Sequence, residues 1–78
     1  MEEVLRTIIE ELVENKDAIS IETSEKDGKE VYSVKVDPSE MGKVIGKQGK
    51  IAQSIRTIMR ALATKEHKKI DVEFVDQD

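Results

Sequence analysis

The segment Val44-Ile45-Gly46-Lys47-Gln48-Gly49-Lys50-Ile51 places two glycines on either side of two polar residues, Lys47 and Gln48. Glycine adopts left-handed backbone angles without steric cost, and its missing side chain lets another backbone approach closely. Apolar residues on both sides of the segment recur at helical spacing. The segment therefore predicts a tight turn that connects two helices.

The helix before this turn has a clear start at Asp37-Pro38-Ser39-Glu40. Asp37 is suited to cap the helix, and Pro38 fits the first helical position because its missing N–H would be unpaired there anyway. Glu40 is spaced to reach back and complete a capping box. Gly46 then predicts the end of the helix, which is therefore short.

The helix after the turn is expected to begin after Gly49 and to continue to about Ala63. Its apolar positions form one stripe with a wider flank, made of Ile51, Ile55, Ile58 and Leu62 with Ala52, Met59 and Ala63. Arg56 and Arg60 lie on the other side of that stripe. They are expected either to contact a phosphate group or to remain in solvent.

The rest of the chain has the patterns of one more helix and three strands. Residues 2–15 carry apolar side chains at helical spacing, whereas residues 19–23, 32–36 and 70–74 alternate between apolar and polar. Residues 26–29 contain the dipeptide Asp-Gly, the strongest short signal for a β-hairpin. The predicted order of elements is α-β-β-α-α-β.

This order predicts an α+β fold with a three-stranded mixed sheet. The first two strands pair antiparallel through the hairpin, and a crossover through two helices makes the third strand parallel to the second. Three helices should pack on one face of the sheet. The other face is polar enough for water, since it carries Ser20, Glu22, Lys35, Asp71 and Glu73.

The N-terminus of the helix after Gly49 is a candidate anion site. No residue in its first turn (Lys50, Ile51 and Ala52) has a side chain suited to capping the unpaired N–H groups. Those donors lie at the positive end of the helix dipole, and Lys43 and Lys47 are nearby in the sequence. The arrangement suits a phosphate. An ordinary helix-turn-helix connection with exposed lysines is the alternative.

The turn, the following Ile55-Arg56-Thr57 and the order of elements resemble the type II KH domain, in particular the small bacterial RNA-binding proteins that consist of a single KH domain. The resemblance extends over one domain, residues 1–78. It implies an RNA chaperone or post-transcriptional regulator that grips about four nucleotides of single-stranded RNA. The RNA-binding residues implied are Lys43, Ile45, Gly46, Lys47, Gln48, Gly49, Lys50 and Ile51.

Within that set, the resemblance gives different roles to different positions. Lys47 and Gln48 match the two variable positions of the loop, and Ile45 and Ile51 would frame the groove for the bases. Residues 34–36 would lie near its far wall.

The resemblance also implies pairing with a second copy of the chain, or with a larger KH-containing protein. Ile58 and Met59 are the expected interface, because the apolar arc of their helix is wider than a small sheet requires. Ile51, Ile55 and Leu62 near the middle of the arc should face the core, which leaves Ile58 and Met59 toward its opposite edges. The alternative is that the first helix covers these edges completely. A dimerising adaptor that docks a partner KH protein and binds nucleic acid weakly is the alternative function.

Charge is distributed unevenly along the chain. The net charge of the 78 residues is −4, but residues 1–40 carry −7 and residues 41–70 carry +7. This distribution suggests a basic face that binds a polyanion, although a solvated charged surface explains it equally well.

Other classes of function have little support in the sequence. Its one histidine, His67, is expected to be a surface loop residue because no second ligand or catalytic base is apparent, and we expect no enzyme activity, metal or cofactor. The chain lacks cysteine, a signal peptide and a membrane-spanning apolar run, so a cytoplasmic location is expected.

Overall fold

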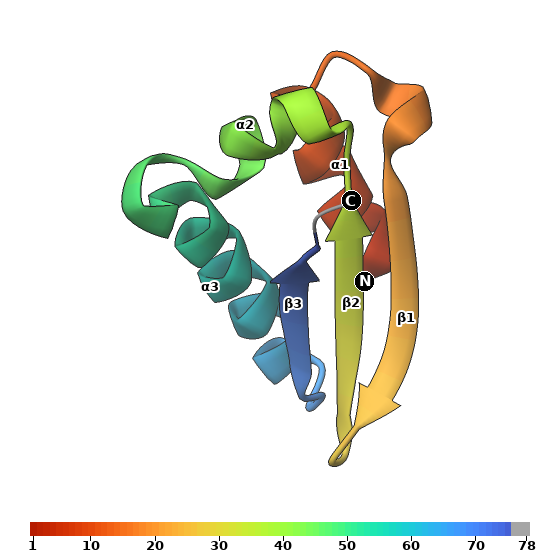
Figure 1. The fold of residues 1–78 in the computed structure, drawn as a ribbon. Helices are drawn as coiled ribbons and strands as arrows, with labels where there is room; N and C mark the ends of the chain where they lie inside the picture. Colours follow the sequence, from red (N-terminus) through yellow and green to blue (C-terminus); the bar gives the residue numbers. More distant parts are fainter. Residues whose placement is uncertain (76–78) are drawn as a thin grey trace.

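The computed structural model describes residues 1–75 and has the predicted order of elements (Figure 1). Its helices are α1 (Glu2–Leu12), α2 (Met41–Ile45) and α3 (Lys50–Lys65). Its strands are β1 (Ser20–Lys26), β2 (Lys29–Lys35) and β3 (Ile70–Phe74). Three short 3-10 turns lie at residues 16–18, 38–40 and 47–49. The α-β-β-α-α-β order of a type II KH fold is confirmed, and residues 76–78 of the predicted domain lie outside the described part.

The sheet has the predicted mixed pairing, with the strand order β1-β2-β3. β1 and β2 are antiparallel, and the residues between them, Asp27 and Gly28, have φ angles of 53° and 80°. Two successive positive φ angles match the right-handed twist of the strands, which explains the Asp-Gly sequence. β2 and β3 are parallel, and the crossover between them contains α2 and α3. β3 is therefore an edge strand beside α3 (Figure 1).

The helices pack on the face of the sheet that carries Tyr32, Val34 and Val72. The buried core combines these side chains with apolar residues from every helix, namely Leu5, Ile9, Val13, Ile19, Val36, Val44, Ile55, Met59, Ala63 and Ile70. Tyr32 is 3% exposed, and its hydroxyl donates to Glu30 at 2.9 Å. Burial and this neighbouring carboxylate raise the pKa of Tyr32 to about 12.

α1 is shorter than the sequence predicts and buries a narrower stripe. It ends at Leu12, and Val13 is extended and buried. Val4 is one of the apolar side chains at helical spacing in residues 2–15, but it is 42% exposed. The early end of the helix has a visible cause, because the N–H groups of Glu14 and Asn15 donate to the carboxylate of Glu40 at 2.7 and 3.1 Å.

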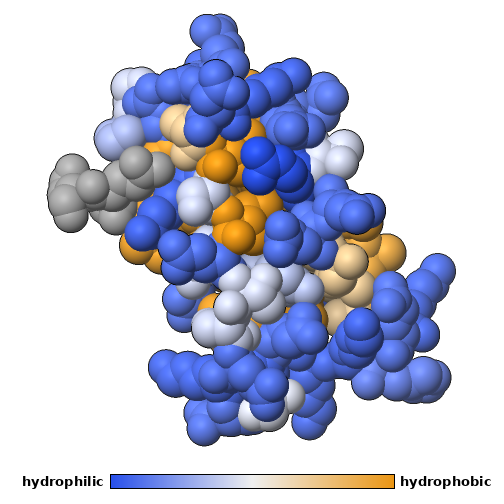
Figure 2. Space-filling model, turned by 90° about the vertical axis from the view of Figure 1, so that its right-hand side faces the viewer, coloured by the Kyte–Doolittle hydropathy of each residue, from blue (hydrophilic) through white to orange (hydrophobic). Residues whose placement is uncertain are grey.

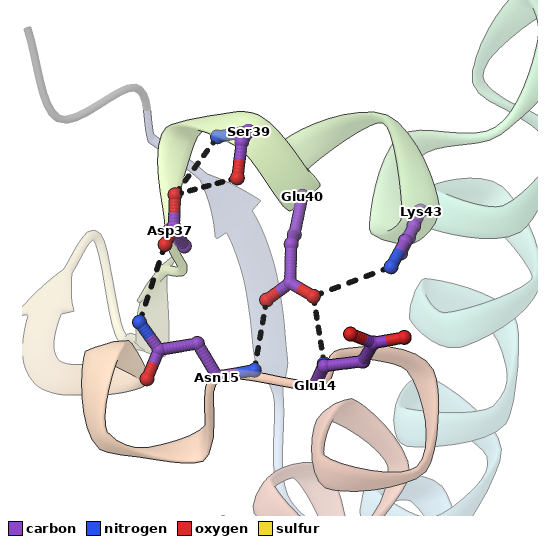
Figure 3. A network of polar contacts seen from close by, with 6 residues as sticks. All are labelled: Glu14, Asn15, Asp37, Ser39, Glu40 and Lys43. Carbon is purple, nitrogen blue, oxygen red and sulfur yellow. Dashed lines mark hydrogen bonds and ion pairs between the residues drawn. The ribbon is translucent and has the colours of Figure 1, made fainter.

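Glu40 thus has a different role from the predicted one (Figure 3). Asp37 caps the turn at Ser39, as expected, by accepting from its N–H at 3.0 Å and its hydroxyl at 2.8 Å. Glu40 completes no capping box. Its side chain joins the end of α1 to the start of α2, and the hydrogen bonds from Glu14, Asn15 and Lys43 hold the pKa of Glu40 below its usual value.

The surface away from the core is mostly hydrophilic, in agreement with the polar residues predicted for the open face of the sheet. Figure 2 shows an apolar area in the middle of one side of the molecule, surrounded by hydrophilic residues. No helix within residues 1–75 is long and apolar enough to cross a bilayer. The same residues contain no cluster of acidic and histidine side chains that could hold a metal ion.

Candidate nucleic-acid interface

The turn between α2 and α3 requires glycine at its first position. Gly46 has φ 76° and ψ 179°, a combination of angles found almost only in glycine. A Cβ atom at this position would lie 2.6 Å from Cγ1 of Ile51. The Gly46 N–H donates to the carbonyl of Gly42 at 2.9 Å, which closes α2. The predicted end of the helix is confirmed, and the space beside Gly46 is filled by the side chain of Ile51.

The next three residues, Lys47 to Gly49, form one 3-10 turn. Gln48 and Gly49 both have left-handed backbone angles, with φ of 56° and 75°. The Gly49 N–H donates to the carbonyl of Gly46 at 3.3 Å. The side chains of Lys47 and Gln48 are exposed. The turn therefore presents two polar side chains on a backbone that its glycines hold in a narrow loop.

The N-terminus of α3 is uncapped, as the sequence predicts. Gly49 is its N-cap residue, and no side chain accepts a hydrogen bond from the first turn. The Lys50 N–H donates to the carbonyl of Lys47, while the helix start as a whole has no side-chain cap. The N-terminus of a 16-residue helix attracts anions through its N–H groups and the helix dipole. Lys47 and Lys50 are exposed on either side of this helix end.

Lys43 is less available to bind an anion than Lys47 and Lys50 are. Its ammonium group lies 3.3 Å from the carboxylate of Glu40, although 48% of its side chain remains exposed. Ile45 and Ile51 are half-buried beside the turn and pack against the core. These residues and the two glycines are thus brought together, as expected.

The family of this chain follows from its similarity to known proteins. A model of the family described as "KhpA/KhpB, KH domain" matches residues 2–74. The chain belongs to this KH-domain family. The family is not a family of enzymes, in agreement with the expectation from the sequence.

Similar proteins are found in several bacteria, under the name "RNA-binding protein KhpA". The one from Caldanaerobacter subterraneus is 45% identical over 75 residues, which cover 96% of this chain and all of that protein. The one from Clostridium acetobutylicum is 41% identical with the same coverage. The one from Aquifex aeolicus is 38% identical over 97% of this chain and 96% of its own length.

Residues 34–36 do not form the far wall of a groove in this KH domain. Val34 and Val36 are completely buried, and β2 is the central strand of the sheet. β3, not β2, lies at the edge of the sheet beside α3. The alternation of apolar and polar residues in the sequence predicts that β2 is a strand, but it does not show that β2 is the central one. Residues 34–36 were therefore expected at the groove although they are in the middle of the sheet.

Arg56 and Arg60 both bind β3. The Nε of Arg56 donates to the carbonyl of Val72 at 2.9 Å, and its guanidinium lies 5.6 Å from the ring centre of Phe74. Arg60 pairs with Asp71 at 2.9 Å, while about half of its side chain, 54%, stays exposed. Both arginines therefore hold α3 against the edge strand, a role that the sequence did not indicate.

The two residues expected at a dimer interface lie on different faces of α3. Ile58 is 49% exposed, whereas Met59 is completely buried in the core. The prediction for Met59 is wrong, because the sheet contacts the face of α3 that carries Ala52, Ile55, Met59 and Ala63. Ile51 and Leu62, expected at the centre of that face, lie half-buried at its border.

Proposed function

We propose that this chain binds single-stranded RNA through the turn at residues 46–49. The sugar-phosphate backbone lies against the turn and the uncapped start of α3, and about four nucleotides are held. Lys43, Lys47 and Lys50 supply positive charge, and Gln48 contacts the strand. Bases rest on Ile45 and Ile51. In a bacterial cell such a protein acts in the cytoplasm as an RNA chaperone or post-transcriptional regulator.

The observation that carries this proposal is the geometry at Gly46. Its angles and its distance to Ile51 leave no room for a side chain in front of an uncapped helix end. Only glycine fits this position, so the chain turns sharply just before the N-terminus of α3, which has no side-chain cap and suits a phosphate group. The relatives named as RNA-binding proteins support RNA as the source of that phosphate.

Salt dependence tests the proposal. A fluorescently labelled single strand of about eight nucleotides is titrated by anisotropy at several salt concentrations. Two to four neutralised phosphates give a slope of log affinity on log salt of roughly −1.5 to −3. RNA and DNA strands of the same sequence are compared to detect recognition of the 2′-hydroxyl. A slope near zero contradicts phosphate binding.

We further propose that α3 pairs with a second copy of the chain, or with a larger KH-containing protein, through Ile58. A half-exposed isoleucine on a helix is a suitable two-fold contact, because the same side chain is buried in both partners. The exposed neighbours Ser54, Thr57 and Ala61 are small, so another helix can approach closely. This surface also supports the alternative function, a dimerising adaptor with auxiliary RNA binding.

Replacing Ile58 with lysine is expected to give a folded monomer. The side chain is 49% exposed, so the lysine reaches solvent without disturbing the core. Mass in solution and helix content are measured together. Val4→Lys is the matched control, since Val4 is 42% exposed on α1. An unchanged dimer of Ile58→Lys places the interface elsewhere, and loss of helix content contradicts the half-exposed position of Ile58.

A further inference from the structure

A second concentration of positive charge lies at the opposite end of α3 from the turn. It surrounds a surface cavity of about 220 Å³. Four cationic side chains and no carboxylate line this cavity, together with Ala63, Thr64 and Ile70; the cations are Lys29, Arg60, Lys68 and Lys69. They come from the start of β2, the end of α3 and the connection to β3. Lys29 is far from the other three in the sequence, and only the fold brings the four together.

The backbone holds the connection after α3 in a defined shape. The Lys68 N–H donates to the carbonyl of Ala63 at 2.8 Å, and the His67 N–H donates to that of Thr64 at 3.1 Å. His67 has a left-handed φ of 58°, as in the Schellman motif that ends many helices. The carbonyl of Lys69 accepts from Glu30 at 3.0 Å, so this connection is attached to the start of β2.

Carboxylates near the cavity neutralise only part of its charge. Asp71 pairs with Arg60 at 2.9 Å, and Glu66 lies 3.9 Å from Lys68. Within residues 1–75, Lys29 and Lys69 take part in no ion pair. The cavity therefore retains an excess of positive charge, and an excess of this kind favours an anionic ligand.

The surface of α3 that joins the two ends carries no negative charge. Residues 50–65 contain Lys50, Arg56, Arg60 and Lys65 but no aspartate or glutamate. Lys50 and Arg60 are ten positions apart, which corresponds to about 15 Å along the helix axis. At roughly 3.4 Å per stacked nucleotide, a strand covers this distance with four or five nucleotides.

We propose that the cavity is a second phosphate site for a single RNA strand that also occupies the turn. This inference rests on the proposed function. A strand with its backbone at residues 46–49 continues along α3, and a later phosphate enters the cavity between Lys29, Lys68 and Lys69. The strand bound in this way is longer than the four nucleotides that the turn holds.

The test compares a four-nucleotide single-stranded RNA, the length that the turn holds, with a twelve-nucleotide one. Lys68→Gln/Lys69→Gln is expected to lower affinity for the longer strand about tenfold and to make its salt slope less steep by about 1.4. Affinity for the shorter strand is expected to stay within about twofold, because the charges lost are remote from the turn. Lys16→Gln/Lys35→Gln is the control, since it removes the same charge from residues that line neither site.

Three outcomes overturn the inference. Unchanged affinity of the Lys68→Gln/Lys69→Gln variant for the longer strand means that the cavity holds no phosphate. Equal losses for both strand lengths, matched by the control, mean that only net charge acts. A loss that also occurs with heparin, without dependence on strand length, means general attraction of polyanions.

A variant of the turn separates this inference from the proposed function. Lys47→Asp/Gln48→Asp tests binding at the turn with the same two strands. If that variant binds both strands normally, the proposed function fails, whatever the lysines of the cavity do. If it binds neither strand while Lys68→Gln/Lys69→Gln binds both normally, only the second site fails.

Discussion

Changing Lys47 and Gln48 together to aspartate is expected to abolish RNA binding, with a loss of affinity on the order of 100-fold or more. The two carboxylates would repel the phosphates and accept hydrogen bonds from the N–H groups at the start of α3. Both side chains are exposed, and aspartate tolerates the left-handed angles of position 48, so the fold is expected to persist. Anisotropy measures the affinity, and circular dichroism measures the helix content.

The matched control for this variant is Lys16→Asp/Ser24→Asp. It introduces the same change in net charge at two exposed positions, before and within β1, that line no part of the turn. We expect it to weaken binding by less than about tenfold, because exposed charges beyond one Debye length are largely screened. Equal effects of the two variants would show that net charge, not the turn, governs binding.

Gly46→Ala is expected to destabilise the domain by about 2–3 kcal/mol, since backbone angles in this region are strained for any residue other than glycine. The new Cβ atom would also lie 2.6 Å from Cγ1 of Ile51, which must move. For a domain of this size the melting temperature is expected to fall by at least about 10 °C. Thermal unfolding followed by circular dichroism measures the change.

Gly42→Ala provides the contrast within the same short helix. A Cβ atom at Gly42 has no atom within 4 Å, and its φ is not left-handed. Alanine is expected to stabilise this helical position by about 0.5–1 kcal/mol relative to glycine. Equal melting temperatures for Gly46→Ala and Gly42→Ala would contradict the geometry described for the turn.

Local sequence signals predicted the features that depend on a few neighbouring residues. The hairpin follows from Asp27 and Gly28, and the turn between the helices follows from Gly46 and Gly49. The parallel pairing of β2 and β3 follows from the connection through two helices, because a crossover of that length returns in the same direction. These features need no knowledge of distant contacts.

The errors concern side chains whose partners are distant in the sequence. Glu40 has the spacing of a capping box, but it accepts hydrogen bonds from residues 25 and 26 positions earlier. Arg56 is 16 positions from the carbonyl that it contacts. Lys29 and Lys69 line one cavity only because β2 and β3 pair. None of these contacts leaves a periodic pattern in the sequence.

The sequence alone also does not predict which side of α3 faces the core. Ile58 and Met59 are adjacent and both apolar, so either could face the core on a helical wheel. The position of β3 decides between them, since it sets which side of α3 the sheet covers. Met59 is buried as a result, and Ile58 remains half-exposed.

Chemical-shift mapping with a four-nucleotide single-stranded RNA tests RNA binding at the turn most directly. The strand is added to ¹⁵N-labelled protein, and the backbone amide signals are followed through the titration. We predict that the largest shifts occur at residues 46–52, where the turn and the first N–H groups of α3 lie. Unchanged signals at these amides, together with shifts around Ile58 or on the open face of the sheet, would contradict RNA binding at the turn.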